Sequence, residues 1–285
     1  MDPIRRGERL SRFTAAGLVF DVRDEGPVDG PVVIALHGFP QTAASWSAVI
    51  PLLTAAGYRV LAPDQRGYSP GARPSGVRAY AMDGLVADVL ALADAAGAER
   101  FHVLGHDWGA AVAWTLASRH RDRIASLSAV SVPHPAALQR AFAGTQLLRS
   151  WYIGLFQLPR LPELLLRVRG GVLARRLLAA SGLRSLDESV QLLSDGRTAS
   201  AMLGWYRAVR VRGQLTAGRV RVPTLFVWSD GDSAIGRRAA EGAAAFVTGP
   251  YRFEILRGSH WIPEERPEQL AALVVDHLVA HPITS

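Results

Sequence analysis

The chain has 285 residues, of which 49% are hydrophobic and 20% are charged, and its formal net charge is +7 at pH 7. This composition excludes a disordered chain and is sufficient for one large α/β domain with an inserted module. Cysteine is absent, which excludes disulfides and thiolate metal sites. No apolar run approaches the ~18 residues of a membrane span, and no apolar segment follows the basic residues of MDPIRRGERLSRF. We therefore expect a cytoplasmic protein without a membrane partner.

The positive charge is unevenly distributed along the chain. All basic residues apart from histidine are arginines, and the stretch 132–222 holds 14 of them against 4 acidic residues, so that it carries about +10 and the remainder about −3. No nucleic-acid-binding motif accompanies these arginines. We expect them to form solvated faces, and we expect no nucleic-acid partner.

Strand patterns alternate with helical patterns from the beginning of the chain. Apolar and polar residues alternate over 12–23, and continuous apolar runs typical of buried parallel strands follow. The seven expected strands lie at 12–23, 31–38, 58–64, 100–106, 124–130, 224–230 and 251–256. The spacing of apolar residues predicts helices over 46–56, 82–96 and 108–118. This alternation predicts a mostly parallel sheet with helices on both faces.

Residues 133–219 depart from this alternation. The segment is rich in leucine and arginine, contains Pro159, Pro162 and paired glycines, and predicts several short helices without a strand. Because open α/β sheets bind ligands beyond the carboxyl ends of their strands, an insertion at this point would lie over the binding site. We expect 133–219 to form a helical cap on a core made of residues 1–132 and 220–285.

The stretch Gly105-His106-Asp107-Trp108-Gly109 has the spacing of a nucleophile elbow, the sharp strand-to-helix turn that exposes a reactive side chain. Asp107 stands at its centre, where serine is expected. Asp230 and Asp232 follow a later strand, and His260 follows the last one. This order of nucleophile, acid and base favours catalysis over a role for Asp107 as a helix cap alone.

The segment His37-Gly38-Phe39-Pro40 follows the strand at 31–38 and predicts a Gly-containing turn. Such a turn can direct the backbone N–H of Phe39 into the site beside that of Trp108, which would form an oxyanion hole. A simple tight turn would account for Gly38 and Pro40, but not for their coincidence with the elbow.

Two other roles for the histidines carry less weight. His260, next to Trp261, could be a packed histidine, but its place after the last strand favours catalysis. A metal site built from His37, Asp64 and His106 would have no recognised ligand spacing. We expect neither a metal nor a cofactor.

The chain resembles the α/β-hydrolase superfamily throughout its length. The variant elbow "GHDWG", with "HGFPQTAASW" and "APDQRGYSPGARP", resembles the branch with an aspartate nucleophile, which contains epoxide hydrolases and haloalkane or haloacetate dehalogenases. The resemblance implies an α/β-hydrolase fold and an ester-forming Asp107. It also places the acid partner of His260 at the second aspartate of "WSDGD", Asp232, with Asp230 as the alternative.

Two segments of the expected cap favour the epoxide hydrolases within this branch. "YIGLFQLP" at 152–159 resembles their pattern Tyr-x-x-x-Phe-Gln-x-Pro, and "GWYRA" at 204–208 resembles their second tyrosine segment. These matches imply that Tyr152 and Tyr206 donate a proton to the epoxide oxygen. Residues expected to support the substrate pocket are His37, Pro40, Trp151, Phe156, Trp205 and Trp261.

The sequence therefore predicts an epoxide hydrolase whose partners are a small epoxide and water, and which forms a monomer or homodimer. Asp107 would open the ring to give an ester, and His260, oriented by Asp232, would activate water to cleave it. Two alternatives stay open. A dehalogenase would use the same nucleophile with tryptophan N–H groups facing the halide, and a non-catalytic relic would bind a small molecule without turning it over.

Overall fold

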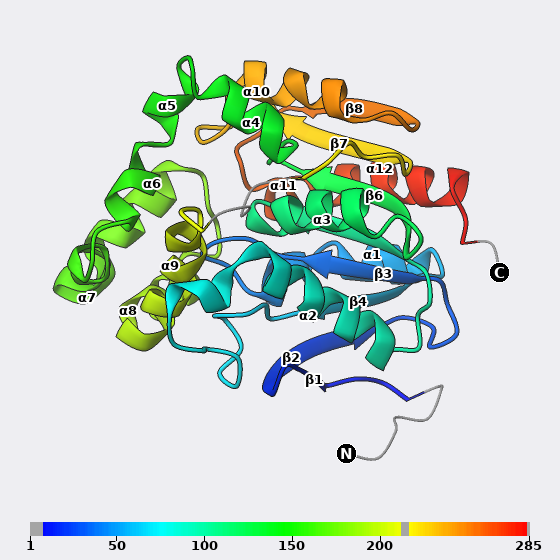
Figure 1. The fold of residues 1–285 in the computed structure, drawn as a ribbon, viewed down its shortest axis with the longest axis horizontal. Coiled ribbons are helices and arrows are strands. Elements are labelled where there is room, and N and C mark those ends of the chain that lie inside the picture. The colour runs from blue at the N-terminus through cyan, green and yellow to red at the C-terminus, as the bar shows by residue number, and fades with distance from the viewer. Residues whose placement is uncertain (1–7, 212–216, 284–285) are drawn as a thin grey trace.

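One sheet of eight strands forms the centre of the structure in the residues that this computed structural model describes, 8–211 and 217–283 (Figure 1). Its order is β1-β2-β4-β3-β5-β6-β7-β8. The β1–β2 and β2–β4 pairs are antiparallel, and the other five pairs are parallel. The strands are β1 Arg12–Ala15, β2 Leu18–Glu25, β3 Val32–Leu36, β4 Arg59–Pro63, β5 Phe101–His106, β6 Ile124–Val130, β7 Thr224–Ser229 and β8 Tyr251–Leu256. The mostly parallel sheet is confirmed.

The single strand predicted over 12–23 is wrong, because this stretch forms the hairpin β1–β2. Ala16 and Gly17 both have positive φ and turn the chain. The buried positions are odd-numbered in β1 and even-numbered in β2. Within one continuous strand, the residues that face the core are either all odd-numbered or all even-numbered. The turn is therefore required if both β1 and β2 are to bury their apolar side chains.

Helices cover both faces of the sheet and leave two apolar cores. α2 and α3 pack on one face, and α1 and α12 pack on the other (Figure 1). The α-helices are α1 Ile50–Ala55, α2 Met82–Ala95, α3 Trp108–Arg119, α4 Pro135–Ala141, α5 Gln146–Arg149, α6 Trp151–Phe156, α7 Leu161–Ala180, α8 Leu186–Ser194, α9 Gly196–Ala208, α10 Arg237–Glu241, α11 Ile262–Glu265 and α12 Pro267–Ala280. Short 3₁₀ turns are η1 Ala43–Trp46, η2 Val77–Tyr80 and η3 Gly242–Phe246.

The helix expected over 46–56 is shorter than predicted. The structure has η1, which ends at Trp46, and then α1, in which Pro51 lies in the first turn. Proline suits this place because its missing N–H has no helical partner there. The two other predicted core helices correspond to α2 and α3 within one residue at each end.

Between β6 and β7 the described chain is helical, from α4 to α9. Helices α6 to α9 pack on one another at the left of Figure 1, and α9 also packs on η2, whereas α4 packs on α10 and η3. The backbone of α7 is interrupted at 168–171, where φ and ψ are not helical. Residues 212–216 of the expected cap, like 1–7 and 284–285, lie outside the described residues.

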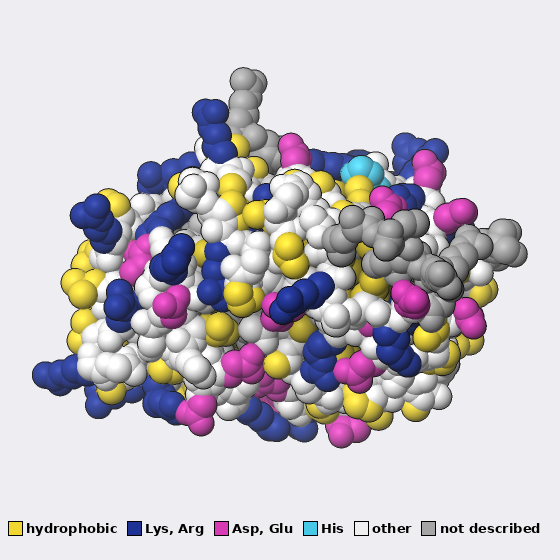
Figure 2. Space-filling view, turned by 90° about the horizontal axis from the view of Figure 1, so that it is seen from below, with side chains coloured by type: hydrophobic (Ala, Val, Ile, Leu, Met, Phe, Trp, Pro, Cys, Tyr) yellow, Lys and Arg dark blue, Asp and Glu magenta, His cyan; other side chains and the backbone are white. Residues whose placement is uncertain are grey.

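Charged side chains of both signs are interspersed on the face shown in Figure 2. Among the helices of residues 8–211 and 217–283, none has the length and apolar content that a bilayer crossing requires.

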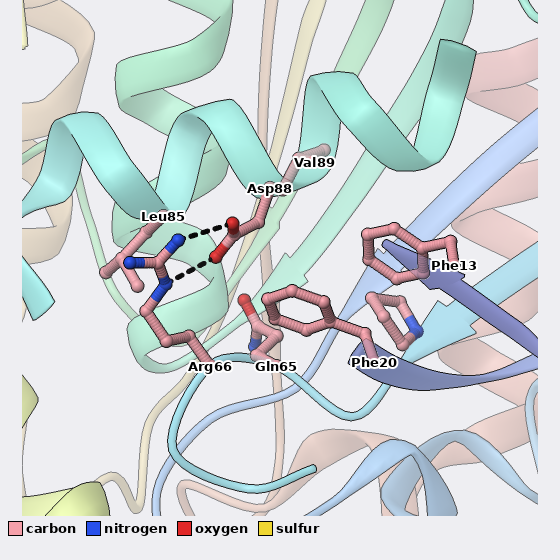
Figure 3. Close-up of a pocket in the computed structure, with 8 residues that line it drawn as sticks. Phe13, Phe20, Gln65, Arg66, Leu85, Asp88 and Val89 are labelled. Atoms are coloured by element: carbon pink, nitrogen blue, oxygen red, sulfur yellow. Dashed lines mark hydrogen bonds and ion pairs between the residues drawn. The ribbon is translucent and has the colours of Figure 1, made fainter. Parts of the chain in front are cut away.

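Two buried ion pairs fix the edge of the sheet and the loop after β4. Asp24 in β2 accepts hydrogen bonds from Arg59 at 2.9 and 2.6 Å and from the Leu10 N–H at 2.8 Å. The carboxylate of Asp88 in α2 accepts from Arg66 at 2.8 and 2.6 Å (Figure 3). A cavity of only about 10 Å³ lies beside this second pair. It is too small for a ligand, so the pair is structural.

Replacing Asp24 by alanine is expected to lower the free energy of unfolding by about 3–5 kcal/mol, because the charge of Arg59 stays buried without its partner. Urea denaturation measures the loss. Asp21→Ala is the control, since it removes only the exposed pair of Asp21 with Arg12 and should cost about 1 kcal/mol or less. Equal losses in the two variants would contradict the role of the buried pair.

Candidate active site

Asp107 stands at a sharp turn between β5 and α3. Its φ of 52° and ψ of −121° are strained for a residue with a side chain. The glycines on either side are required by close packing, since a Cβ on Gly109 would overlap the Leu36 carbonyl oxygen and one on Gly105 would overlap the backbone of Gly109. The turn therefore has the geometry of a nucleophile elbow and places the Asp107 carboxylate beyond the end of the sheet.

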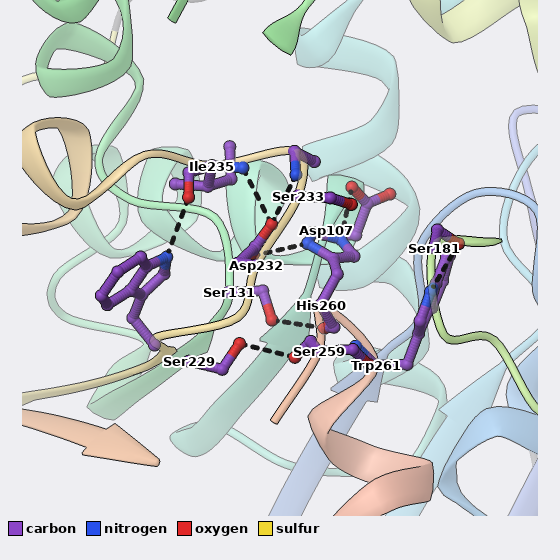
Figure 4. A network of polar contacts seen from close by, with 12 residues as sticks. Asp107, Ser131, Ser181, Ser229, Asp232, Ser233, Ile235, Ser259, His260 and Trp261 are labelled. Atoms are coloured by element: carbon purple, nitrogen blue, oxygen red, sulfur yellow. Dashed lines mark hydrogen bonds and ion pairs between the residues drawn. The ribbon is translucent and has the colours of Figure 1, made fainter. Parts of the chain in front are cut away.

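His260 joins Asp107 to Asp232 (Figure 4). Its Nε2 lies 3.4 Å from Oδ2 of Asp107, and its Nδ1 lies 2.8 Å from Oδ2 of Asp232. The backbone N–H groups of Ala234 and Ile235 donate to Oδ1 of Asp232 at 2.7 and 2.8 Å. Asp232 is buried, whereas Asp230 is exposed. The arrangement brings three residues that are far apart in the sequence into one chain of contacts, in the order expected for a nucleophile, a base and an acid.

The turn after β3 supplies hydrogen-bond donors to the Asp107 carboxylate. The Phe39 N–H donates to Oδ1 at 2.8 Å, and the Trp108 N–H also donates to this carboxylate. Oδ1 therefore accepts at least one of these backbone donors, and Oδ2 faces His260. An oxygen in the place of Oδ1 would be stabilised as negative charge developed on it.

Burial and neighbouring charges set the protonation of this chain. Burial alone would raise the pKa of Asp107, but the hydrogen bond and charge of His260 outweigh it and lower the pKa below its usual value. Burial would lower the pKa of His260, but the Asp232 and Asp107 carboxylates raise it to about 10. Asp107 is thus an ionised carboxylate next to an imidazolium at neutral pH.

The loop that carries His260 is held by side chains from neighbouring strand ends. The His260 carbonyl accepts from Ser131 Oγ at 2.7 Å and lies 2.9 Å from Nε2 of His106, while Ser229 Oγ donates to the Ser259 carbonyl at 2.5 Å (Figure 4). Burial lowers the pKa of His106 to about 4, so its ring is neutral. Sequence reasoning did not single out Ser131, whose contact spans 129 residues and leaves no local pattern.

A cavity of about 580 Å³ adjoins Asp107 and His260. Its wall is mainly apolar, and α7 contributes much of it through side chains such as Pro162, Leu166 and Ala174. Of the residues expected to support a substrate pocket, the cavity is lined by Pro40, Trp151, Phe156 and Trp261. Its size and lining suit a small apolar ligand.

Tyr152 in α6 and Tyr206 in α9 line the same cavity as Asp107. Their rings are 6.1 Å apart between centroids, and Tyr206 also packs edge-on against Phe39 and Trp108. Burial, followed by the Asp107 charge, raises the pKa of both phenols above the usual value. Both side chains are therefore neutral hydroxyl groups near an ionised carboxylate.

Gln157 links the two helices that carry these tyrosines. Its Nε2 donates to the Tyr206 carbonyl at 2.7 Å and to the Ile153 carbonyl at 3.3 Å. Gln157 lies within the quoted segment at 152–159, but its role in connecting α6 to α9 was not predicted.

Two residues expected to support the pocket lie behind it instead. Trp205 is buried, and its indole N–H donates to the Arg66 carbonyl at 2.7 Å, away from the cavity. His37 is buried behind the turn, and its Nε2 accepts from the Gln65 N–H at 3.0 Å. Their contribution is thus to hold loops next to the cavity, because α9 and the turn at His37 present other side chains to it.

Arg149 lies on the cavity wall, and its Nη1 donates to the carbonyls of Asp232 and Ser233 at 2.9 and 3.1 Å.

Across the part of the chain that the structure describes, no three histidine, aspartate or glutamate side chains are grouped so that they could hold a metal ion.

The free energy of unfolding should decrease as the pH rises above 6.5, because His260 then loses its proton in the unfolded chain. Its pKa is about 10 in the folded chain against 6.5 when unfolded, so its contribution is complete below pH 6.5 and is lost as the pH rises to 10. Between about pH 7.5 and about pH 9.5 the free energy of unfolding should fall by up to about 1.4 kcal/mol per pH unit. Urea denaturation at both pH values should show a shallower fall for His260→Gln. Equal falls in both proteins would rule out this linkage.

Comparisons with known proteins agree with the geometry. Residues 31–267 match the family model for the alpha/beta hydrolase fold. The chain is 34% identical to AB hydrolase superfamily protein YfhM of Bacillus subtilis, over 95% of this chain and 98% of the relative. It is 36% identical to Epoxide hydrolase A of Mycobacterium tuberculosis, over 92% and 94% of the two chains.

Among solved structures, Epoxide Hydrolase A from Mycobacterium thermoresistibile superposes with a TM-score of 0.81 at 29% identity, covering 96% of this chain and 98% of that one. The family match spans most of the chain, and the relatives are similar over nearly their whole length. The chain therefore belongs to the α/β-hydrolase fold family and is a hydrolase similar to epoxide hydrolases.

Proposed function

We propose that the chain hydrolyses a small epoxide to a vicinal diol through a covalent ester on Asp107. The observation that carries this proposal is the pairing of an ionised carboxylate with two neutral phenols across one apolar cavity. A carboxylate forms an ester that water can cleave, and a phenol protonates the oxygen that leaves the ring carbon. The described residues of 133–219 serve as the cap that supplies both phenols.

In the first step Oδ2 of Asp107 attacks a ring carbon. Oδ1 is the less suitable nucleophile because it accepts the N–H of Phe39. The C–O bond of the ring breaks, and Tyr152 or Tyr206 gives its proton to the oxygen, leaving a phenolate and a hydroxyalkyl ester. The other phenol stabilises the oxygen through a hydrogen bond.

In the second step His260 activates water. Ester formation removes the negative charge of Asp107, which is one of the two carboxylates that raise the pKa of His260, so the imidazolium becomes a stronger acid. It gives its proton to the phenolate left by the first step, which restores the phenol and leaves His260 neutral. Nε2 then takes a proton from water, which attacks Cγ of Asp107, and the N–H groups of Phe39 and Trp108 stabilise the oxyanion at Oδ1.

Collapse of the tetrahedral intermediate completes the cycle. The diol oxygen leaves Cγ and takes the proton held by His260, and the acid proton left on Asp107 then passes to Nε2 of His260, which restores the resting pair of carboxylate and imidazolium. Asp232 keeps the ring of His260 oriented, since Oδ1 of Asp232 is itself fixed by two backbone N–H groups. The net reaction adds one water to the epoxide, so no cofactor takes part.

Of the three tryptophans that could serve a dehalogenase, Trp108, Trp151 and Trp205, two already have hydrogen-bond partners, and Trp151 lies on the cavity wall with 60% exposure. The Trp205 indole N–H is bonded to the Arg66 carbonyl, and the Trp108 indole forms a hydrogen bond with the Tyr206 hydroxyl. A halide next to Asp107 would therefore compete with two existing hydrogen bonds. The site favours a leaving oxygen that accepts a proton over a leaving halide.

Replacing His260 by glutamine is expected to stop the second step and leave the first intact. Incubation of His260→Gln with styrene oxide should increase the intact mass by the mass of one substrate molecule. Asp107→Ala is the control and should give no adduct and no turnover. A His260→Gln protein that forms diol, or that gains no mass while Asp107 is present, would contradict the ester scheme. Unreacted epoxide bound in both variants would support the non-catalytic alternative.

Removal of the phenols should affect ring opening specifically. Tyr152→Phe and Tyr206→Phe are each expected to lower the rate of diol formation by about a hundredfold, and the double variant should lose it, because general-acid catalysis contributes about that much or more. Diol release from styrene oxide and halide release from a bromoalkane are measured side by side. If the natural protein releases halide, and the double variant releases it at the same rate, the protein is a dehalogenase instead.

A further inference from the structure

Large apolar side chains are exposed mainly on one part of the structure. Of the fifteen such side chains in the described residues, ten lie between residues 147 and 177, on α5 to α7 and the turn before α7. Single exposed leucines are ordinary in a water-soluble protein, but a concentration of this kind marks an interaction surface.

The first part of α7 has apolar side chains on two sides. Pro162 and Leu166 are buried and line the cavity. Leu161, Leu164 and Val168 are 41%, 61% and 42% exposed and do not line it. The spacing of three residues places Leu161 and Leu164 on one side of the helix. Val168 follows at the start of the interruption in α7, and Leu158 precedes them with 44% exposure. We call these four residues the outer α7 face.

Arginines without acidic partners surround the outer α7 face. Arg160, Arg167, Arg169 and Arg176 are exposed, and among the described residues none of them forms an ion pair. Of the acidic side chains nearby, Glu163 pairs with Arg207 and Asp187 with Arg175. Asp195 accepts hydrogen bonds from Thr198, and its carboxylate also attracts Arg167 without forming an ion pair with it. At the left of Figure 2, the end of the molecule where α7 lies in Figure 1, dark-blue arginines stand beside yellow apolar side chains.

We propose that the outer α7 face docks on an anionic lipid surface. Its apolar side chains would enter the boundary between headgroups and acyl chains, and the arginines would contact lipid phosphates. A second copy of this chain fits less well, because a symmetric contact would bring the same arginines together without acids to pair them. A membrane partner was not expected from the sequence, which has no apolar run of spanning length, but a helix that lies on a surface needs no such run.

The docked face adjoins the cavity. Trp151, Leu173 and Leu177 are 60%, 39% and 50% exposed and also line the cavity. Exposed apolar side chains are thus part of the cavity wall itself, and an apolar compound dissolved in the lipid could reach the cavity past them. The docking itself does not depend on the reaction proposed for Asp107.

The test is sedimentation of the full chain with vesicles of phosphatidylcholine alone and of phosphatidylcholine mixed with phosphatidylglycerol. We expect binding to the mixed vesicles, much weaker binding to the neutral ones, and a decrease when salt is added. Arg167→Gln combined with Arg176→Gln should weaken binding about fivefold per arginine. Leu161→Gln combined with Leu164→Gln should weaken it as well.

The matched control is Arg121→Gln combined with Arg219→Gln, which removes the same charge from a pair of arginines beside the end of α3. This control should bind as the natural chain does, and circular dichroism establishes that every variant is folded. No binding to mixed vesicles, or an equal loss in the control, would overturn the proposal. A dimer in light scattering that Leu161→Gln with Leu164→Gln dissociates, without vesicle binding, would assign the face to a second copy instead.

Discussion

The contact of His260 with two carboxylates is the constraint on which the rest of the site depends. Asp107 follows β5, Asp232 follows β7 and His260 follows β8, so the contact exists only while these parallel strands end side by side. The donors that fix the His260 carbonyl, Ser131 and His106, come from the ends of β6 and β5. The position of His260 is thus fixed by contacts with residues at the ends of β5, β6 and β7.

The described part of 133–219 adds what the sheet does not supply. The core provides an ionised carboxylate and an imidazolium, and α6 and α9 provide neutral hydroxyl groups whose pKa is raised by burial. Two environments therefore act on one cavity: hydrogen bonds and charge keep a carboxylate ionised, while burial keeps the phenols protonated. This difference in protonation suits a reaction in which one group attacks and another gives up a proton.

Local patterns in the sequence predicted the sheet and the elbow, and the order of the strands predicted that His260 and an aspartate after β7 would lie near Asp107. The choice of Asp232 over Asp230 came from the family resemblance. The β1–β2 hairpin was missed because residues 15–20 include no polar side chain, and this run conceals the change of parity between the two strands. The orientation of Trp205 could not be predicted, because helical spacing does not tell which of two adjacent aromatic residues faces the cavity. That choice depends on the Arg66 carbonyl, 139 residues away in the chain.

The hydrogen bonds of Gln157 make the spacing of the two phenols depend on a single amide. Since one Nε2 contacts the backbone of both α6 and α9, a movement of either helix is transmitted to the other, and Tyr152 and Tyr206 shift together relative to Asp107. The choice between the two carbons of an asymmetric ring is governed by where the oxygen is held. If the proposed ring opening takes place here, position 157 is a place at which natural variation would alter the handedness of the product without a change in Asp107, Tyr152 or Tyr206.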